Sequence, residues 1–227
     1  MATIHTDILL DTRASANVRV LELLQNTTDA EGIHYNDACR VHVVPADTKL
    51  SYAAVSYMWG DATTTAHILV NRQPFRVRLN LLELLEELKA RRYRGFLWID
   101  AICIDQSSIL EHNHQVAIMG KIFTKASRVI VWLGIPTEDM KCSLEFLEDP
   151  RPTSKNRGVI FELQLRGIRD ICSHPYWSRA WIFQEVVLAI HVELYCGTHS
   201  VPLLKLNKLC KTLGGRCYKG LVTGYFH

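Results

Sequence analysis

Three short apolar runs, each ending at a turn or a polar residue, constrain the fold of this chain most strongly. The runs and the residues that follow them are Tyr52 to Tyr57 before Trp59-Gly60-Asp61, 96–99 before Asp100, and 129–133 before Gly134. Apolar runs of this length with such boundaries are typical of buried strands. Apolar residues at helical spacing over 109–126 separate the second run from the third. Strand, helix and strand in this order predict an α/β fold with a central parallel sheet, right-handed crossovers and flanking helices.

Further periodic segments predict elements on both sides of this sheet. Residues 18–24 and 39–44 are expected to add N-terminal antiparallel strands, although 18–24 also fits a helix. A β-hairpin is expected around Asn71-Arg72-Gln73-Pro74. Asn80 is expected to cap a helix whose apolar face consists of leucines between 81 and 88. The remaining predicted elements are helices at 161–172, 181–189 and 202–213 and a strand at 192–196.

Composition predicts one domain in the cytoplasm. The chain has 227 residues, of which 48% are hydrophobic, so one sizeable core can be buried. The net charge of +3 is spread along the sequence, which argues against nucleic acid or an anionic membrane as a partner. No apolar run reaches membrane-spanning length, and the N-terminus has no basic segment followed by an apolar stretch. We therefore expect a non-secreted protein without a membrane segment, with one domain over residues 1–227.

The cysteines, one loop and the tail complete this outline. The seven cysteines are scattered and form no Cys-x-x-Cys pair, which favours reduced thiols over a disulfide framework or a zinc site. Residues 149–158 contain two prolines and are interpreted as a loop insertion, because the α/β pattern resumes after them. The C-terminal tail has no clear apolar period, as expected of a domain cut from a longer protein.

Three motifs follow one another along the chain. They are Ser56-Tyr57-Met58-Trp59-Gly60-Asp61, the segment Leu97-Trp98-Ile99-Asp100-Ala101-Ile102-Cys103-Ile104-Asp105-Gln106, and Trp177-Ser178-Arg179-Ala180-Trp181-Ile182-Phe183-Gln184-Glu185. With Cys196-Gly197 beyond them, residues 52–197 resemble the fungal HET (heterokaryon incompatibility) domain, which is distantly similar to TIR domains. The resemblance implies a TIR-like or flavodoxin-like fold and a role in triggering or executing cell death. His112 departs from the family pattern, which has arginine directly after the glutamate at position 111.

The resemblance also implies a candidate catalytic residue, Glu185. In enzymatic TIR relatives a tryptophan is followed four residues later by a glutamate needed to cleave NAD, and Trp181 and Glu185 keep this spacing. Residues four apart share a helix face, so the indole and the carboxylate are expected in one cleft. Glu185 would bind the ribose of NAD and stabilise an oxocarbenium-like transition state. The alternative is a structural ion pair, with Arg179 as a candidate partner.

The ends of the predicted strands supply candidate residues for binding a nucleotide. These residues are Ser56, Tyr57, Trp59, Gly60, Asp61 and Asp100. The carboxyl ends of parallel strands meet at the sheet edge where open α/β folds bind ligands. Gly60 would let the backbone approach a phosphate or ribose, and Asp61 would bond to a hydroxyl. Alternatively, Gly60 only permits the turn and Asp61 caps the next element. Asp100 has the same two interpretations, a ligand contact or a cap.

The second motif also contains groups that resemble a nucleophile or a metal site. Cys103 with His112 or His114 as its base has the composition of a nucleophilic pair, but a buried thiol is the favoured interpretation. His112 and His114 lie two apart, on different faces of a helix, so we expect no metal site.

Three functions stay open at this level. The first is cleavage of NAD at the nicotinamide–ribose bond, with NAD as the substrate and no required cofactor. The second is a non-enzymatic module that self-associates or binds other death-pathway domains, since a fold alone does not decide function. The third is binding of a nucleotide without cleavage.

Overall fold

A mixed sheet organises the structure, which is a computed structural model. The model describes residues 4–5, 10, 17–24, 27–28, 34–35, 38–150 and 157–212. Within these residues, nine strands form one sheet in the order β11-β10-β9-β5-β8-β1-β4-β6-β7. The strands are β1 (Asn17–Leu24), β4 (Ala38–Pro45), β5 (Tyr52–Tyr57), β6 (Thr65–Val70), β7 (Gln73–Arg78), β8 (Phe96–Trp98), β9 (Arg128–Trp132), β10 (Val192–Cys196) and β11 (His199–Pro202). The short strands β2 (Thr27–Thr28) and β3 (His34–Tyr35) pair separately.

The middle of this sheet is parallel, as the sequence predicts. Strands β10, β9, β5 and β8 run in the same direction, and every residue of β5 is buried. The α/β prediction is therefore confirmed. The N-terminal prediction is confirmed as well, because β1 is a strand that pairs antiparallel with β4 and with β8. The predicted hairpin is formed by β6 and β7, and its turn residues Asn71 and Arg72 both have positive φ, as a tight two-residue turn requires.

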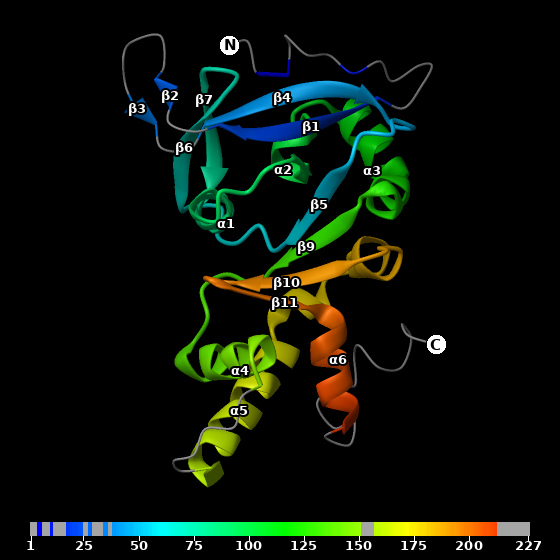
Figure 1. Ribbon diagram of the computed structural model, residues 1–227. Helices are drawn as coiled ribbons and strands as arrows, with labels where there is room; N and C mark the ends of the chain where they lie inside the picture. The colour runs from blue at the N-terminus through cyan, green and yellow to red at the C-terminus, as the bar shows by residue number, and fades with distance from the viewer. Residues whose placement is uncertain are drawn as a thin grey trace.

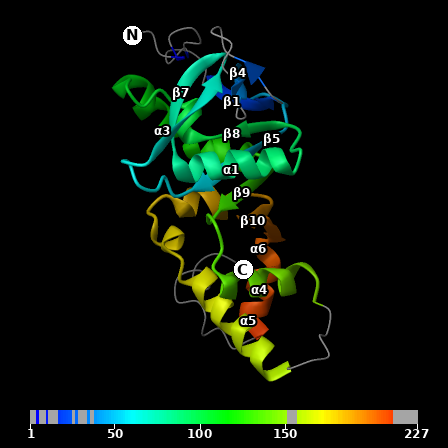
Figure 2. The same ribbon diagram turned by 90° about the vertical axis from the view of Figure 1, so that its left-hand side faces the viewer.

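Helices cover the sheet in two groups. Figure 1 shows α1 and α3 around the β5–β8–β1 part of the sheet, whereas α4, α5 and α6 gather beyond β10 and β11, and Figure 2 shows the same division from the side. The helices are α1 (Leu79–Ala90), α2 (Asp100–Cys103), α3 (Ile109–Lys125), α4 (Glu138–Glu148), α5 (Arg157–Cys172) and α6 (Leu203–Thr212). Two irregular turns follow α5, a 3₁₀-helix η1 (Pro175–Ser178) and a π-helix η2 (Phe183–Val187).

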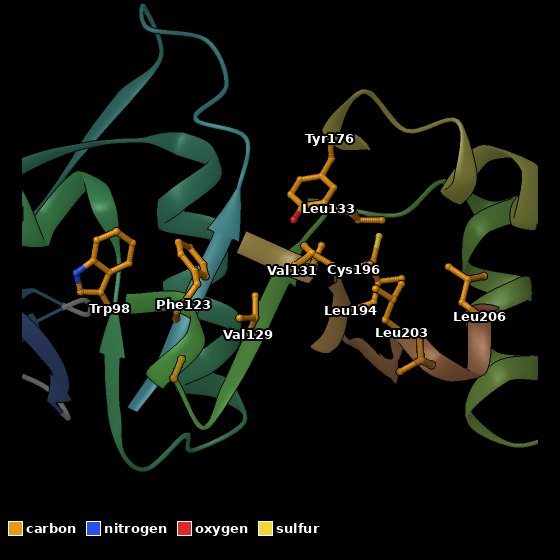
Figure 3. Packing of buried hydrophobic residues seen from close by; sticks show 14 of the residues in the cluster. Trp98, Phe123, Val129, Val131, Leu133, Tyr176, Leu194, Cys196, Leu203 and Leu206 are labelled. Carbon is orange, nitrogen blue, oxygen red and sulfur yellow. The ribbon is translucent and has the colours of Figure 1, made fainter. Parts of the chain in front are cut away.

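The two faces of the sheet bury separate hydrophobic cores. Successive side chains of a strand point to opposite faces, so Val129 and Val131 of β9 enter one core while Trp132 enters the other. The first core joins α3 to the β10 end of the sheet, and Figure 3 shows its side chains running from Trp98 and Phe123 through β9 toward α6. The second core holds the buried leucines of α1. Burial on both faces explains why the central strands are apolar without alternation.

The prediction that Asn80 caps α1 is wrong. The helix begins one residue earlier, at Leu79, after the extended Arg78, whose side chain makes no capping hydrogen bond. Asn80 instead connects two strands, because its amide donates to the carbonyl of Met58 and its Oδ1 accepts a bond of 2.9 Å from Nε1 of Trp132. Asn80 therefore holds the turn after β5 against the end of β9.

Other boundaries differ from the sequence-based expectations. The predicted helix over 181–189 is in fact the short π-helix η2, and the sequence pattern did not predict α4 or β11. Helix α5 begins at Arg157, inside the loop expected at 149–158. Residues 151–156 of that loop and the tail from 213 onward lie outside the described residues.

Candidate functional site

A buried polar cluster lies at the carboxyl end of β5, centred on Ser56. The Ser56 hydroxyl donates to Oε2 of Glu185 and is hydrogen-bonded to the Tyr176 hydroxyl. Because serine has a single proton, Tyr176 is the donor in the second bond. Arg179 donates from Nη1 to Oε2 and from Nη2 to Oε1 of Glu185, both at 2.9 Å, and from Nη1 to Ser56 Oγ at 3.3 Å. Ser56 and Glu185 are thus fully engaged inside the protein.

The irregular segment after α5 supplies three of these four groups. Tyr176 lies in η1, where the His174 side chain accepts a bond from its backbone N–H, and Figure 3 shows its ring beside Leu133 at the end of β9. Burial raises the pKa of Tyr176, so its hydroxyl stays protonated. Arg179 directly follows η1, with its guanidinium 5.4 Å from the centre of the Tyr176 ring. Glu185 lies in η2, and π-helical turns are frequent at functional sites.

Trp181 and Glu185 occupy different environments. The Trp181 side chain is 47% exposed, whereas Glu185 is 2% exposed. The backbone N–H groups of Gln184 and Glu185 both donate to the Trp181 carbonyl, so the chain makes a tight turn here before the π-helix. The structure therefore holds Glu185 in an ion pair with Arg179, the alternative that the sequence left open, and it leaves the indole at the surface.

A second polar cluster surrounds Asp100. Trp59 Nε1 donates to Oδ2 of Asp100 at 2.8 Å, and the backbone N–H of Ala101 donates to Oδ1 at 2.7 Å. Burial and the charge of Asp100 raise the pKa of Tyr57. Burial raises the pKa of Asp100 to about 6, against these hydrogen bonds, and the negative charge of Glu185 adds to the rise. The two clusters are therefore close enough to interact electrostatically.

A cavity of about 380 Å³ adjoins the Asp100 cluster. Tyr57 and Trp59 form part of its wall, with Arg76, Arg78, Ala101 and Gln106. The guanidinium of Arg78 lies 5.0 Å from the centre of the Trp59 ring and also donates to the Gly60 carbonyl at 2.7 Å. The partly exposed Trp59 indole beside two cationic side chains suits a ligand that combines a planar ring with phosphates. The cavity is thus a binding space beside Tyr57 and Trp59, two of the residues predicted from the sequence.

Gly60 and Asp61 serve the turn after β5. Gly60 has a φ of +76°, a conformation that glycine adopts without strain. Asp61 is exposed, its Oδ1 accepts a bond of 2.8 Å from the backbone N–H of Thr63, and hydrogen bonds from Thr63 lower its pKa. These contacts agree with the interpretation that Gly60 and Asp61 shape the turn.

The raised pKa of Asp100 predicts a pH dependence of stability. An aspartate with a higher pKa in the folded than in the unfolded protein binds more protons when folded, so the free energy of unfolding falls as pH rises through this range. Asp100→Asn stays neutral at every pH. Relative to this variant, the free energy of unfolding of the parent is expected to fall by about 2 kcal/mol between pH 4 and pH 6.5. Urea unfolding of both proteins across this range measures the difference.

Asp61→Asn is the matched control for this measurement, because the pKa of the exposed Asp61 is lowered. For this pair, the free energy of unfolding of the parent relative to that of Asp61→Asn should rise with pH, in contrast to the fall expected for Asp100. If the difference in free energy of unfolding between the parent and Asp100→Asn does not change with pH, the Asp100 carboxyl titrates as it does in water.

The second motif contributes structural contacts. Cys103 is fully buried, and burial raises the pKa of its thiol to about 12, which does not suit a nucleophile. Glu111 pairs with the buried Arg19 of β1 through contacts of 2.5 and 3.1 Å, and it accepts a bond from the backbone N–H of Asp105. Within the described ranges, no group of three His, Cys, Asp or Glu residues is placed to hold a metal ion.

Sequence reasoning missed Arg19, the partner of Glu111, and Tyr176, a member of the Ser56 cluster. Arg19 lies in an apolar strand far from the motifs, and no local pattern identifies Glu111 as its partner. Tyr176 directly precedes the third motif, and this position beside Trp177 was the only available signal. Both residues become informative only when the sheet brings distant segments together.

These features define an α/β domain with a buried carboxylate cluster at the carboxyl edge of its parallel strands. The family model of the heterokaryon incompatibility protein (HET) matches residues 52–185, more than half of the chain, and the chain belongs to this family. It is similar to heterokaryon incompatibility protein 6, OR allele, of Neurospora crassa, with 31% identity over 148 residues. That match covers 60% of this chain and 21% of the relative, so the chain spans about a fifth of the relative's length.

Two further findings bear on the class of protein. No solved structure matches the chain. Among the helices of the described residues, none combines the length and the apolar character needed to cross a membrane.

Proposed function

We propose that this chain acts in heterokaryon incompatibility as a cytoplasmic domain that triggers cell death, and that it does so by cleaving NAD. Membership of the HET family and the similarity to heterokaryon incompatibility protein 6 support the first part. The position of Glu185 supports the second, because its carboxylate lies at the edge of the parallel strands where α/β folds bind ligands. This position is the observation on which the enzymatic proposal rests.

The cavity beside the Asp100 cluster supplies groups suited to NAD, although Glu185 does not line it. Arg76 and Arg78 would meet the pyrophosphate, and the partly exposed indole of Trp59, which has Arg78 over its ring, would meet a planar ring. In the reaction, the bond between ribose C1′ and the nicotinamide nitrogen breaks, and its electron pair leaves with nicotinamide. Water then adds at C1′ and loses a proton, which gives ADP-ribose. Glu185 would stabilise the positive charge that develops on the ribose ring.

This mechanism requires a rearrangement of Arg179. Both carboxylate oxygens of Glu185 accept bonds from Arg179, so the ribose hydroxyls can reach the carboxylate only after the guanidinium has moved. The Arg179 side chain is partly exposed, at 23%, and it lies in the irregular segment between η1 and η2. A movement of this side chain toward solvent is the simplest way to free Glu185.

A second candidate function is self-association without catalysis. In this case the ion pair between Glu185 and Arg179 only stabilises the fold. Large apolar side chains are also exposed in the segment around Glu185. Trp181, Leu188 and Ile190 are 47%, 40% and 70% exposed. An apolar groove of about 330 Å³ between η2 and the start of α6 includes Ile190 and Leu204 in its wall. Exposed apolar surface of this kind favours contact with a second copy of the domain.

The Glu185→Gln substitution separates the two candidates. Glutamine keeps the size of the side chain and one acceptor, so the fold is expected to persist while release of nicotinamide from NAD falls by roughly 100-fold. Nicotinamide release by the purified chain and its toxicity on expression are measured side by side, with melting temperatures to verify folding. Glu162→Gln, an exposed change on α5, is the control.

Full nicotinamide release by the Glu185→Gln protein would contradict the catalytic role. If neither protein releases nicotinamide and both are toxic, the self-associating module becomes the better description. In that case, light scattering should show assemblies that Ile190→Asp disperses.

A further inference from the structure

Cys172 and Cys210 bring two sulfur atoms into contact where α5 and α6 meet. The two Sγ atoms are 3.8 Å apart, although the residues are 38 positions apart in the sequence. A disulfide needs a sulfur–sulfur distance of about 2 Å, so each sulfur has to shift by only about 1 Å. Rotation of the side chains can supply such a shift, and the two helices do not have to be rebuilt.

The two thiols differ in accessibility in a way that suits stepwise oxidation. Cys172 ends α5 and is partly exposed, whereas Cys210 is fully buried. An oxidant in solution therefore reaches Cys172 first, and the buried sulfur of Cys210 is already in contact with the oxidised atom. A partly exposed thiol beside a second thiol is the usual arrangement of a reversible redox site.

We propose that Cys172 and Cys210 form a reversible intramolecular disulfide when the domain meets a peroxide. In the first step, the Cys172 sulfur attacks hydrogen peroxide, the O–O bond breaks, and sulfenic acid and water form. In the second step, the Cys210 sulfur attacks the sulfenic sulfur, the S–O bond breaks, and a second water leaves. The two thiols lose two electrons, which the peroxide gains, and a cellular thiol reverses the reaction by exchange.

The position of Cys172 connects this reaction to the Ser56 cluster. Tyr176 and Arg179 follow Cys172 closely, and the segment that carries them is tied to the end of α5, because Trp177 Nε1 donates to the Ile171 carbonyl at 2.6 Å. Helix α6 is anchored in turn, since Leu203 and Leu206 are buried in the core. A disulfide fastens the end of α5 to α6 and so restrains the segment that holds Glu185.

The other described cysteines lack this combination of contact and access. Cys39, Cys103 and Cys196 are buried. Cys142 on α4 is partly exposed, but burial and the charges of Glu145 and Asp139 raise the pKa of its thiol, which disfavours the reactive thiolate. Cys142 is therefore a natural control for the reaction at Cys172.

Oxidation of the reduced full chain with hydrogen peroxide tests this proposal. After alkylation of the remaining thiols and digestion, mass spectrometry is expected to find the Cys172 and Cys210 peptides joined, with a mass about 2 Da below their sum. The melting temperature should rise by about 5 °C on oxidation, because the cross-link closes a long loop. Hydrogen exchange of residues 173–179 should slow by about 10-fold, since local opening is restrained. A reductant should reverse all three changes.

Matched variants identify the cysteines that react. Cys172→Ser and Cys210→Ala should abolish the linked peptides and the rise in melting temperature, whereas Cys142→Ser should leave both intact. If Cys210→Ala does not fold, Cys172→Ser carries the test at the more exposed position. Disulfides from Cys172 to any other cysteine, including Cys217, or oxidation of Cys172 to sulfinic acid without a cross-link, would overturn the site. A Cys172–Cys210 disulfide that leaves exchange at 173–179 unchanged would overturn its connection to the Ser56 cluster. None of these readouts depends on NAD cleavage.

Discussion

Replacement of Glu111 with alanine is expected to lower the free energy of unfolding by about 3–5 kcal/mol. The loss arises because Glu111→Ala removes the carboxylate that both Nη1 and Nη2 of the buried Arg19 contact, and the side chains of Arg19 and Glu111 are only 0% and 8% exposed. Arg19 also donates to the Cys103 carbonyl at 3.0 Å, so the change loosens the contact of β1 with the second motif. Urea denaturation followed by circular dichroism measures the effect.

An exposed glutamate provides the comparison for this experiment. Glu162→Ala on α5 removes a charge from the surface and should change stability by less than about 0.5 kcal/mol. The double variant Arg19→Met with Glu111→Leu removes both charges, and it should recover much of the loss. Equal stability of Glu111→Ala and Glu162→Ala would show that water reaches Arg19 and solvates its charge.

The second large effect is expected at the crossing of α4 and α5. A methyl group at Gly167 would overlap with the carbonyl oxygen of Asp139 and with Oγ of Ser143. Ser143 already joins the helices, since its hydroxyl bonds to carbonyls of both Asp139 and Gln164. Gly167→Ala therefore has to push backbone against backbone and is expected to cost about 3 kcal/mol. Thermal unfolding by calorimetry measures this loss.

The same substitution in α3 should act in the opposite direction. At Gly120 a new Cβ would meet Leu188 at 3.7 Å, an ordinary contact, and alanine favours a helix over glycine. Gly120→Ala is thus expected to raise stability by about 0.5–1 kcal/mol. A similar response of the two glycine variants would mean that α4 and α5 separate easily at Gly167.

The sequence predicted the central strands because their burial on both faces leaves an unmistakable apolar run. Tyr52–Tyr57 is such a case, and its bounds match the prediction. The α4 helix was missed although Met140, Leu144 and Leu147 keep a helical spacing, and its contact with α5 could not be read from the sequence because it depends on the close approach at Gly167. Asn80 was misassigned because a polar residue before a helix resembles a cap, and its bond to Trp132 depends on a strand residue 52 positions away.

The candidate site was predicted in its parts but not in its connections. Ser56, Asp100 and Glu185 lie at the carboxyl edge of the sheet, where the order of strands and motifs indicated. The bond from Ser56 to Glu185 joins the first motif to the third, and only the folded sheet sets that distance. The spacing of four is kept in a helical hydrogen bond from the Glu185 N–H to the Trp181 carbonyl, but it does not indicate that the indole is exposed while the carboxylate is buried.

The order of strands in the sheet has a consequence for biosynthesis. Strand β1 leaves the ribosome before the other strands of this sheet, yet it lies between β4 and β8, and Leu21 can pair with Leu97 only after β8 has been synthesised. Strand β9 pairs with β10, which is synthesised only after the four helical segments α4, α5, η1 and η2. Contacts of such high sequence separation slow folding and leave strand edges open in the nascent chain. The domain is therefore expected to depend on chaperones until β10 has emerged, and amino-terminal fragments that stop before β10 should aggregate.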